Sequence, residues 1–330
     1  MPNPANIEQA FIASVNNSSS SIVDAVATST PFLALLRKKG RIRSYTGPKI
    51  EERILYGRPD GMWFQYYDIF PTKPTDILTK AEYTPKQLVV PIVLSGRDIR
   101  DNSGPERVFD LFRGLIDAGK ASARELVYQG IFSDGTANGG KQITGLKAIL
   151  PDNPAVGTYA GINRANWGFW RPGSYDVSDG TALPGTTTLT KDTVMPILRS
   201  VAAKHSAGTN GPDMLIVSPE WASAIYAAAD NMVRLTPGDT ATLGFNTIKL
   251  NLGNGRSVEM AEESGIGSAM PANTAYLLDT DSLALRYHPD ANWTLDEQRK
   301  PLNQDAVVAP ILWQGELTMS NARYNAKITI

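Results

Sequence analysis

Three residues near the middle of the chain have the types and spacing of a phosphate-binding loop. Gly135, Gly140 and Lys141 match the pattern G-x-x-x-x-G-K, in which backbone N–H groups and a lysine hold phosphate oxygens. The next residue should be Ser or Thr, which binds Mg²⁺, but it is Gln142. The loop also follows a predicted helix, so no helix N-terminus is directed at a phosphate. We interpret the segment as a turn, and a soluble α/β nucleotide-binding enzyme is kept as an alternative.

The other residues that could do chemistry form no catalytic or metal-binding set. The chain has two histidines, His205 and His288, and no cysteine, which excludes a three-histidine metal site, thiolate catalysis and disulfides. We expect both histidines to be solvated or to cap local structure. No G-x-S-x-G motif places a nucleophilic serine. The sequence therefore predicts no catalytic residue, no metal site and no cofactor.

Two acidic pairs and one basic run are best explained by local structure. Asp279 and Asp281 lie between two predicted strands, where acceptor side chains suit a turn better than a cation. Glu262 and Glu263 are interpreted as a solvated acidic edge. Residues 37–43, RKKGRIR, carry five positive charges but lack the interleaved aromatic residues of a single-strand nucleic-acid binder. Contact with DNA phosphates and pairing with an acidic patch on a neighbouring subunit are both open for this run.

The glycine loop follows the firmest helical pattern in the chain. Residues 103–106, Ser-Gly-Pro-Glu, form a capping box with proline in the first turn. The helix is predicted over residues 104–129, about 39 Å at 1.5 Å per residue, and should end at Gly130. Gly114 and Gly119 each cost about 1 kcal/mol relative to alanine, so we expect another backbone close by. Spacings of four and three predict one apolar stripe: Val108, Phe112, Leu115, Gly119, Ser122 and Leu126.

Composition bounds the class of protein. The 330 residues allow about two domains, and 42% hydrophobic residues are ordinary for a folded protein. The 32 basic and 33 acidic side chains give no global field that favours nucleic acid or an anionic membrane. The sequence has neither an apolar run of about 18 residues nor a secretory signal pattern. We expect the protein to stay in a cytoplasm or to be built into something assembled there.

Two N-terminal segments lack a core of their own. Residues 1–47 are interpreted as a polar arm that needs a neighbour. Residues 48–95 are interpreted as an exposed β-ribbon, which is marginal in isolation and therefore implies packing against another chain or domain. Its strand-like runs are 52–57, 62–70 and 87–95. A turn is predicted at 58–61, between the first two runs.

The rest of the chain predicts a mixed α/β domain followed by long strands. A helix is expected over 190–205, and 213–230 should be a strand that turns into a helix with Pro219 at its first position. Further strands are expected at 274–279 and 284–288 and within 306–330. No internal repeat of fixed period indicates a solenoid or propeller.

This order of parts, with three local phrases, resembles the major capsid proteins of tailed bacteriophages, which have the Hong Kong 97-type fold. The phrases are YQGIFSDGTANGGKQITGL (128–146), GINRANWGFWR (161–171) and WQGELTMSNARYNAKI (313–328). The resemblance implies an α+β protein with five parts. These are an N-terminal arm (1–47), a β-hairpin called the E-loop (48–95), a peripheral (P) domain with a long spine helix (96–145), an α/β axial (A) domain (146–282), and closing strands that belong mainly to the P domain (283–330).

The resemblance also implies a structural role and a set of partners. Copies of the chain would form hexamers and pentamers of an icosahedral head around double-stranded DNA, assembled in the host cytoplasm and located in the virion. A separate scaffolding protein, a portal, decoration proteins and non-specific contact with packaged DNA are expected, and no membrane contact. Some members of this family cross-link the shell through a lysine of the E-loop and an asparagine of a neighbouring P domain. Lys73 and Lys80 are available here, but neither is matched to that motif, so no cross-link is inferred. The expected subunit-interface residues are Trp63, Phe64, Tyr66, Tyr67, Arg37, Lys38, Lys39, Arg41 and Arg43. An encapsulin-like compartment with protein cargo is the main alternative.

Overall fold

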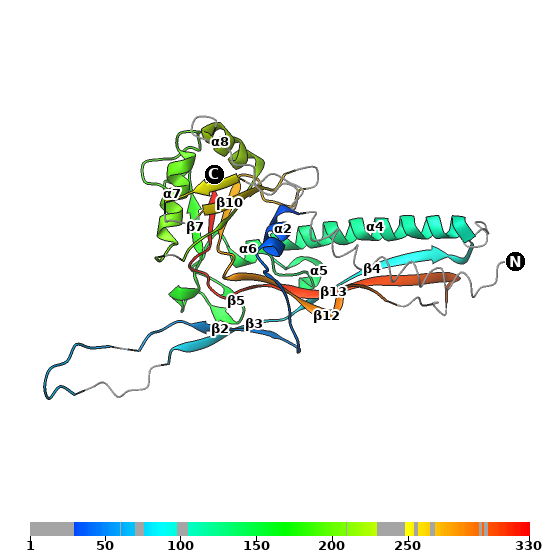
Figure 1. Cartoon of the computed structure of the whole chain (residues 1–330), viewed down its shortest axis with the longest axis horizontal. Coiled ribbons are helices and arrows are strands. Elements are labelled where there is room, and N and C mark those ends of the chain that lie inside the picture. Colours follow the sequence, from blue (N-terminus) through cyan, green and yellow to red (C-terminus); the bar gives the residue numbers. More distant parts are fainter. Residues whose placement is uncertain are drawn as a thin grey trace.

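The computed structural model describes residues 30–59, 61–69, 76–97, 105–208, 210–229, 248–253, 257–264, 268–296, 299 and 303–330, with the backbone alone at 105–112 and 229. Figure 1 shows a rounded body, a long extension made of one helix and several strands, and a thin hairpin that projects from the opposite side. No helix in the described part of the chain is long and apolar enough to cross a membrane. Most of the predicted arm and the predicted capping box lie outside the described residues and side chains.

The predicted long helix is present as α4 (Pro105–Phe132), with 28 residues and therefore a length of about 42 Å. It ends at Phe132, three residues after the predicted last residue 129, because Gly130 is still helical. The carbonyl of Gly130 accepts bonds from both the backbone N–H and the hydroxyl of Ser133, at 3.2 and 3.1 Å. Ser133 thus supplies hydrogen-bond donors to a carbonyl at the C-terminal end of the helix, where intrahelical donors are missing.

The buried stripe of α4 differs from the prediction. Ser122 and Leu126 are exposed. In the part of α4 whose side chains are described, the buried positions are Ile116, Gly119, Ala123, Val127, Gly130, Ile131 and Phe132. The helix is rotated so that small residues face the sheet, which allows a close approach. A Cβ at Gly119 would lie 3.3 Å from side-chain atoms of Ile92 and Ile311, whereas a Cβ at Gly114 would meet nothing within 4 Å. The backbone expected close to both glycines is therefore found at neither: side chains of the sheet approach Gly119, and nothing approaches Gly114.

Helix α4 lies along a four-stranded sheet with the order β1-β12-β13-β4. The pair β13 and β4 is antiparallel over ten residue pairs, from Ala306 opposite Ser95 to Gly315 opposite Lys86. Alternate residues of β4 are buried, as expected for a strand with one covered face. The bounds are β1 (Ile42–Ser44), β12 (Leu283–Leu295), β13 (Ala306–Met319) and β4 (Lys86–Ser95).

The projecting hairpin is built from other strands than predicted. Strand β2 (Ile50–Leu55) pairs with β3 (Leu78–Tyr83) in antiparallel register. The prediction of a strand at 62–70 is wrong for residues 61–69, which form no strand and include a turn at Tyr66 and Tyr67. These residues have β-forming types, but no strand pairs with them in the part of the chain that the structure describes. The predicted run at 87–95 is a strand, β4, but it pairs with β13 in the other sheet and not in a meander with the hairpin.

The body contains a six-stranded sheet with the order β7-β14-β11-β8-β10-β9, covered by α7 and α8 (Figure 1). The predicted strand-to-helix turn is confirmed, with α8 beginning at Pro219. The bounds are β7 (Gly173–Asp176), β8 (Met214–Val217), β9 (Ile248–Asn251), β10 (Ser257–Glu262), β11 (Thr274–Leu278), β14 (Ala326–Thr329), α7 (Val194–Lys204) and α8 (Pro219–Ala229). Short connecting elements are α5 (Ala137–Gly140), α6 (Leu146–Ile149), β5 (Thr158–Tyr159), β6 (Ile162–Asn163) and a 3₁₀ turn (Gly168–Trp170).

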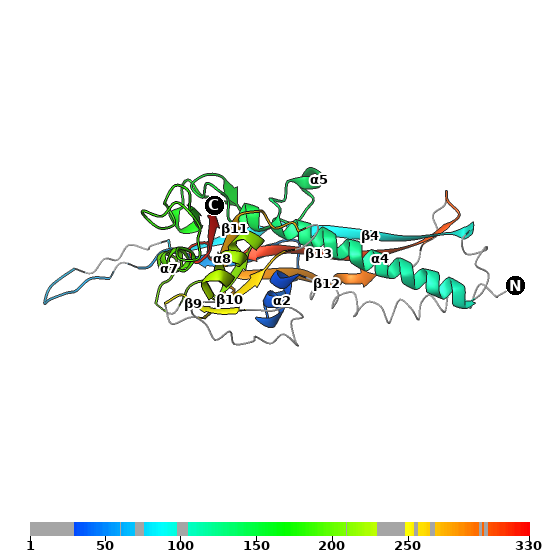
Figure 2. The ribbon, with the colours of Figure 1, turned by 90° about the horizontal axis from the view of Figure 1, so that it is seen from above.

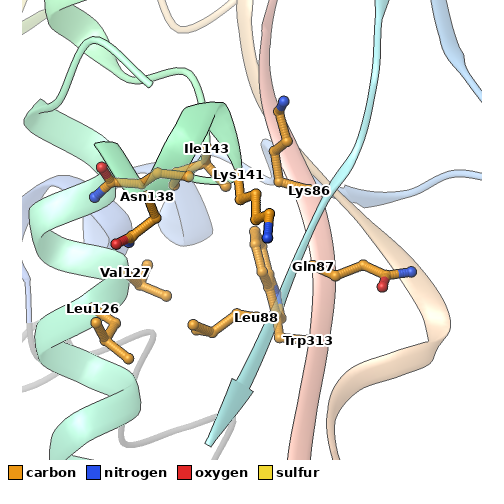
Figure 3. Close-up of a pocket in the computed structure, with 10 residues that line it drawn as sticks. Lys86, Gln87, Leu88, Leu126, Val127, Asn138, Lys141, Ile143 and Trp313 are labelled. Atoms are coloured by element: carbon orange, nitrogen blue, oxygen red, sulfur yellow. The ribbon is translucent and has the colours of Figure 1, made fainter. Parts of the chain in front are cut away.

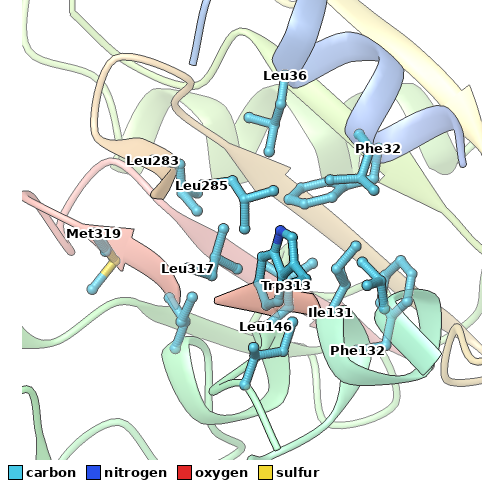
Figure 4. Close-up of a cluster of buried hydrophobic side chains, with 14 of the residues drawn as sticks. Phe32, Leu36, Ile131, Phe132, Leu146, Leu283, Leu285, Trp313, Leu317 and Met319 are labelled. Carbon is cyan, nitrogen blue, oxygen red and sulfur yellow. The ribbon is translucent and has the colours of Figure 1, made fainter. Parts of the chain in front are cut away.

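One apolar core joins segments from both ends of the chain. Figure 4 shows side chains of α2 (Pro31–Lys38), the end of α4, α6, β12 and β13 converging on Trp313. Phe32 and Leu36 of α2 are fully buried there, together with Ile131 and Leu317. A second core lies between α7, α8 and the six-stranded sheet. Helix α2, which follows the first 29 residues, is thus fixed to the body by apolar burial.

Candidate assembly surfaces

The tip of the hairpin exposes an aromatic cluster. Trp63, Tyr66 and Tyr67 are 101%, 95% and 99% exposed, and Phe64 is 64% exposed. The turn that presents them is held by Asp68, whose carboxylate accepts the N–H of Gln65 at 2.6 Å. Burying one such side chain contributes about 1.5–3 kcal/mol, and contiguous exposed apolar residues are typical of an interaction surface. The four predicted aromatic interface residues therefore lie together, at the part of the hairpin farthest from the body (Figure 1).

A cluster of three aromatic rings and an ion pair anchor the base of the hairpin. Tyr56 stacks on Phe169, with ring centroids 5.3 Å apart, and meets Trp167 edge-on at 5.2 Å. Glu52 of β2 accepts two hydrogen bonds from the guanidinium of Arg286 on β12, at 3.1 and 2.5 Å. Trp167 and Phe169 belong to the segment 161–171. By packing against Tyr56, this segment fixes the direction in which the hairpin leaves the body.

Charged residues also order the hairpin itself. Lys80 bridges Glu51 at 3.0 Å and Glu82 at 2.7 Å, so this lysine is paired within the hairpin. Lys80 and Lys49 together lower the pKa of the exposed Glu82 carboxyl to about 2. Lys73 lies outside the described residues.

The basic run 37–43 has partners within the same chain. Lys38 binds Glu259 at 3.1 Å, Lys39 binds Asp213 at 3.2 Å, and Arg41 pairs with Asp281. The Arg43 side chain donates to the carbonyl of Gly40 at 3.3 Å. These pairs fasten α2 and the chain after it to the six-stranded sheet. The acidic partners are 174 to 240 residues away, so no local signal could have identified them.

The two acidic pairs behave differently from one another. Asp279 begins a turn in which its carbonyl accepts the N–H of Ser282 at 3.1 Å, in agreement with the turn interpretation. Among the described residues, no group of three or more acidic or histidine side chains could hold a metal ion. The interpretation of a solvated edge is wrong for Glu263, which is 2% exposed.

Two buried carboxyls are the functional candidates that the sequence did not reveal. Glu263 accepts the N–H of Phe32 at 2.8 Å, and burial raises the pKa of its carboxyl to about 7. Glu316 of β13 accepts the N–H of Thr144 at 2.6 Å, and burial raises the pKa of its carboxyl to about 8. The Glu263 carboxyl therefore connects the residue after β10 to α2, and the Glu316 carboxyl connects β13 to the segment at Thr144. Each carboxyl can change charge near neutral pH.

The histidines form local hydrogen bonds. His205 follows α7 as predicted, and its ring bonds the hydroxyl of Tyr175 at 2.8 Å and the carbonyl of Arg323 at 2.5 Å. Burial lowers the pKa of this imidazole. The ring of His288 accepts the N–H of Asp290 at 3.3 Å. His205 is thus a partly buried link between α7, β7 and the turn before β14, and it is the C-cap residue of α7, in agreement with the capping role predicted for it.

The glycine loop borders a groove and does not form a phosphate cradle. Asn138, Gly139 and Gly140 have positive φ angles, and no helix begins at Lys141, since α6 starts at Leu146. Lys86 instead donates to the carbonyl of Gly140 at 2.6 Å. Figure 3 shows the adjacent cavity of about 120 Å³, which lies between α4, β4 and the loop. Its lining combines two lysines with apolar side chains: Lys86, Lys141, Leu88, Val127, Ile143 and Trp313.

Comparison with known proteins identifies the architecture. No family model matches the chain, and no curated protein matches it. A solved chain from the cyanophage A-1(L) capsid asymmetric unit is similar over 92% of this chain and 93% of its own length, with a TM-score of 0.64 and 17% identity. A chain from the capsid of an empty GTA particle has a TM-score of 0.53 and 12% identity. The similarity covers 90% of this chain and 89% of the GTA chain. A chain from the holo-SrpI encapsulin complex of Synechococcus elongatus PCC 7942 has a TM-score of 0.52 and 9% identity. The similarity covers 89% of this chain and 86% of the encapsulin chain. At these identities the likeness shows the fold.

Proposed function

Because the chain has the Hong Kong 97-type capsid fold, we propose that it is the major capsid protein of a tailed bacteriophage. Copies would form hexamers and pentamers of an icosahedral head that encloses double-stranded DNA, and the role is structural rather than enzymatic. The observation that carries the proposal is the correspondence with the cyanophage capsid chain, which covers 92% of this chain and 93% of the other. The exposed aromatic tip supports it independently, since one chain leaves that surface uncovered.

The proposed parts are those expected from the sequence. Residues 1–47 are the arm, 48–95 the E-loop, 96–145 the P domain with the spine helix, 146–282 the A domain, and 283–330 the closing strands. The long pairing of β13 with β4 and the position of α4 beside them support a P domain built from distant segments. Strand β14 lies in the six-stranded sheet, so the end of the chain also contributes to the proposed A domain.

We propose that the hairpin tip binds a second copy of the chain. Trp63, Phe64, Tyr66 and Tyr67 would be buried on the neighbour, in a head-to-tail contact that forms a ring when its rotation closes. The five cations of the basic run are the second part of the proposed interface. Three of them already have acidic partners within the chain, so any contact they make across a subunit boundary is shared with these pairs.

Electron microscopy of the purified protein tests the shell. Wild-type protein should form closed particles, and the double substitution Trp63→Ser and Tyr67→Ser should leave a folded, unassembled chain. Val156→Ser is the matched control, because Val156 is also an exposed apolar residue (56%) but does not belong to the hairpin segment 48–95. A wild-type monomer that stays monodisperse at high concentration would contradict the shell, and normal particles from the double variant would contradict the tip interface.

An encapsulin-like compartment is the second candidate, favoured by the similarity to the SrpI encapsulin. The contents of native particles separate the two functions: nuclease-resistant double-stranded DNA is expected for a phage head, and protein cargo for a compartment. For the phage head we also propose a virion location, assembly in the host cytoplasm, a separate scaffolding protein, a portal and decoration proteins. The enzyme alternative would require nucleotide binding that is lost on Lys141→Ala.

A further inference from the structure

We propose that α2 is a releasable latch at the base of the N-terminal arm, and that ionisation of the buried Glu263 carboxyl weakens its hold on the body. The first end of this helix is tied to Glu263 and the second end to two ion pairs. The latch is a property of the single chain. Its consequence for a shell, a pH-dependent direction of the arm, rests on the proposed function.

The geometry of Glu263 is that of a helix cap supplied from a distant segment. Phe32 is the second residue of α2, so its N–H is one of the donors that a helix leaves without a partner. Glu263 Oε1 accepts it at 2.8 Å, and the carboxyl is almost completely buried. Thr30, the residue before the helix, makes no side-chain cap of its own. Glu263 therefore supplies the side-chain cap at this end of α2.

The surroundings of Glu263 contain no compensating cation among the described residues. The Tyr128 hydroxyl of α4 bonds Ser268 at 2.9 Å and lies close enough to lower the pKa of the Glu263 carboxyl. The neighbouring Glu262 accepts the hydroxyl of Tyr226 on α8 at 3.3 Å. The lysines of α2 lie at its other end, about 12 Å along the helix, where they bind Glu259 and Asp213. An ionised Glu263 is thus stabilised by the Phe32 N–H, the nearby Tyr128 hydroxyl and the helix N-terminus, and opposed by burial.

Burial is the larger effect, and it sets the direction of the response. The pKa of the Glu263 carboxyl is raised from 4.5 to about 7 when α2 is held. In the released state the carboxyl is solvated and ionises at its ordinary value. The protonated form therefore favours the held state, and the hold weakens as pH rises from 4.5 to 7. By linkage, the ratio of held to released α2 should fall on the order of 100-fold across this window.

Release from this end would have a defined structural effect. Five consecutive residues of α2, from Phe32 to Leu36, are buried, and the Phe32 ring lies 6.4 Å from that of Phe132 on α4. The ion pairs of Lys38 and Lys39 hold the opposite end as a hinge. Opening at Phe32 would expose the end of α4 and redirect the residues that precede α2.

Hydrogen exchange of the full-length protein tests the latch. Amide protection of residues 31–38, corrected for intrinsic exchange, should fall on the order of 100-fold between pH 5 and pH 8, while β11 keeps its protection. Glu263→Gln should remove this fall. Glu262→Gln, the matched control at the adjacent position, should behave like the wild type. Equal protection of 31–38 at both pH values, or a wild-type fall in Glu263→Gln, would overturn the proposal.

A second variant keeps the test decisive if Glu263→Gln does not fold. Tyr128→Phe retains the ring but removes a hydroxyl that lowers the pKa of Glu263, so the fall in protection should still begin near pH 4.5 but extend to higher pH, which moves its midpoint upward. An unchanged midpoint would count against the latch. Failure of the latch and failure of the proposed function are distinguishable. Particles with pH-independent α2 protection refute the latch alone, and a pH-dependent α2 in a protein that never assembles refutes the shell alone.

Discussion

Replacing Glu316 with Gln should remove a loss of stability that the wild-type protein undergoes as pH rises. The Glu316 side chain is 1% exposed, and its Oε1 accepts the N–H groups of Thr144 and Leu317 at 2.6 and 3.3 Å. Its Oε2 has no hydrogen-bond partner among the described residues. Burial outweighs these bonds and the attraction of Lys86, and it raises the pKa of the carboxyl from 4.5 to about 8.

The sign follows from the raised pKa. The unfolded chain ionises this carboxyl near pH 4.5 and the folded chain near pH 8, so the unfolded state gains stability between these values. One pKa unit corresponds to about 1.36 kcal/mol, so the free energy of unfolding should fall on the order of 4 kcal/mol from pH 5 to pH 9 because of this group. Glu263 adds its own smaller decrease, which Glu316→Gln leaves in place.

Urea denaturation at pH 5 and pH 9 measures the effect through tryptophan fluorescence. Trp293 and Trp313 stack in the four-stranded sheet, with ring centroids 5.7 Å apart, so they report on the surroundings of β13. The readout is the difference between the two pH values, because the glutamine amide also introduces a buried donor that lowers stability equally at both. Glu82→Gln is the control, since the pKa of that exposed carboxyl is lowered to about 2 and both measurements lie above it. A Glu316→Gln protein with the wild-type pH dependence would refute the reasoning.

Three further predictions concern the parts that position the assembly surfaces. Gly114→Ala should stabilise α4 by about 1 kcal/mol in urea unfolding, whereas Gly119→Val should destabilise by about 1–3 kcal/mol because its side chain meets the sheet; equal gains would contradict the packing. Tyr56→Ala should weaken amide protection in β2 by removing stacking worth about 1 kcal/mol, with unchanged protection in β11, and a global loss of protection would contradict a local anchor. Glu52→Gln should lower stability by about 1 kcal/mol, and an unchanged urea midpoint would show that its pair with Arg286 is dispensable.

Local patterns predicted the elements whose signals are contained in a short stretch of sequence. The long helix α4 was predicted from its periodicity and cap, and α8 from the proline at its first position. The orientation of α4 could not be predicted as well, because its apolar residues fit two overlapping stripes. The stripe that is buried contains Gly119 and Ala123, which bring the helix axis close to Ile92 and Ile311. That choice depends on the shape of the sheet, which the helix sequence does not contain.

The missed features share a dependence on distant residues. Residues 62–69 have strand-forming types, but strand formation also needs a hydrogen-bonded neighbour, and the described residues supply none at the tip. Glu263 looked solvated because its neighbour Glu262 is acidic, yet the helix end that it caps is 231 residues away. Composition showed that the basic run carries charge without showing where its acidic partners lie. Sequence reasoning therefore identified the parts of the candidate interface and could not identify their internal contacts.

The contrast between the body and the hairpin gives the physical reason to expect assembly. The core around Trp313 unites α2, α4, α6, β12 and β13, so the body satisfies its own apolar surface. The hairpin is anchored at its base by Tyr56 and Glu52, but its aromatic tip stands away from every described part of the same chain. A rigidly directed tip that is uncovered in one copy can be buried by another without refolding the body. Because the tip and the surface it meets differ, such contacts run head to tail, and a closed ring buries every tip whereas a simple dimer need not.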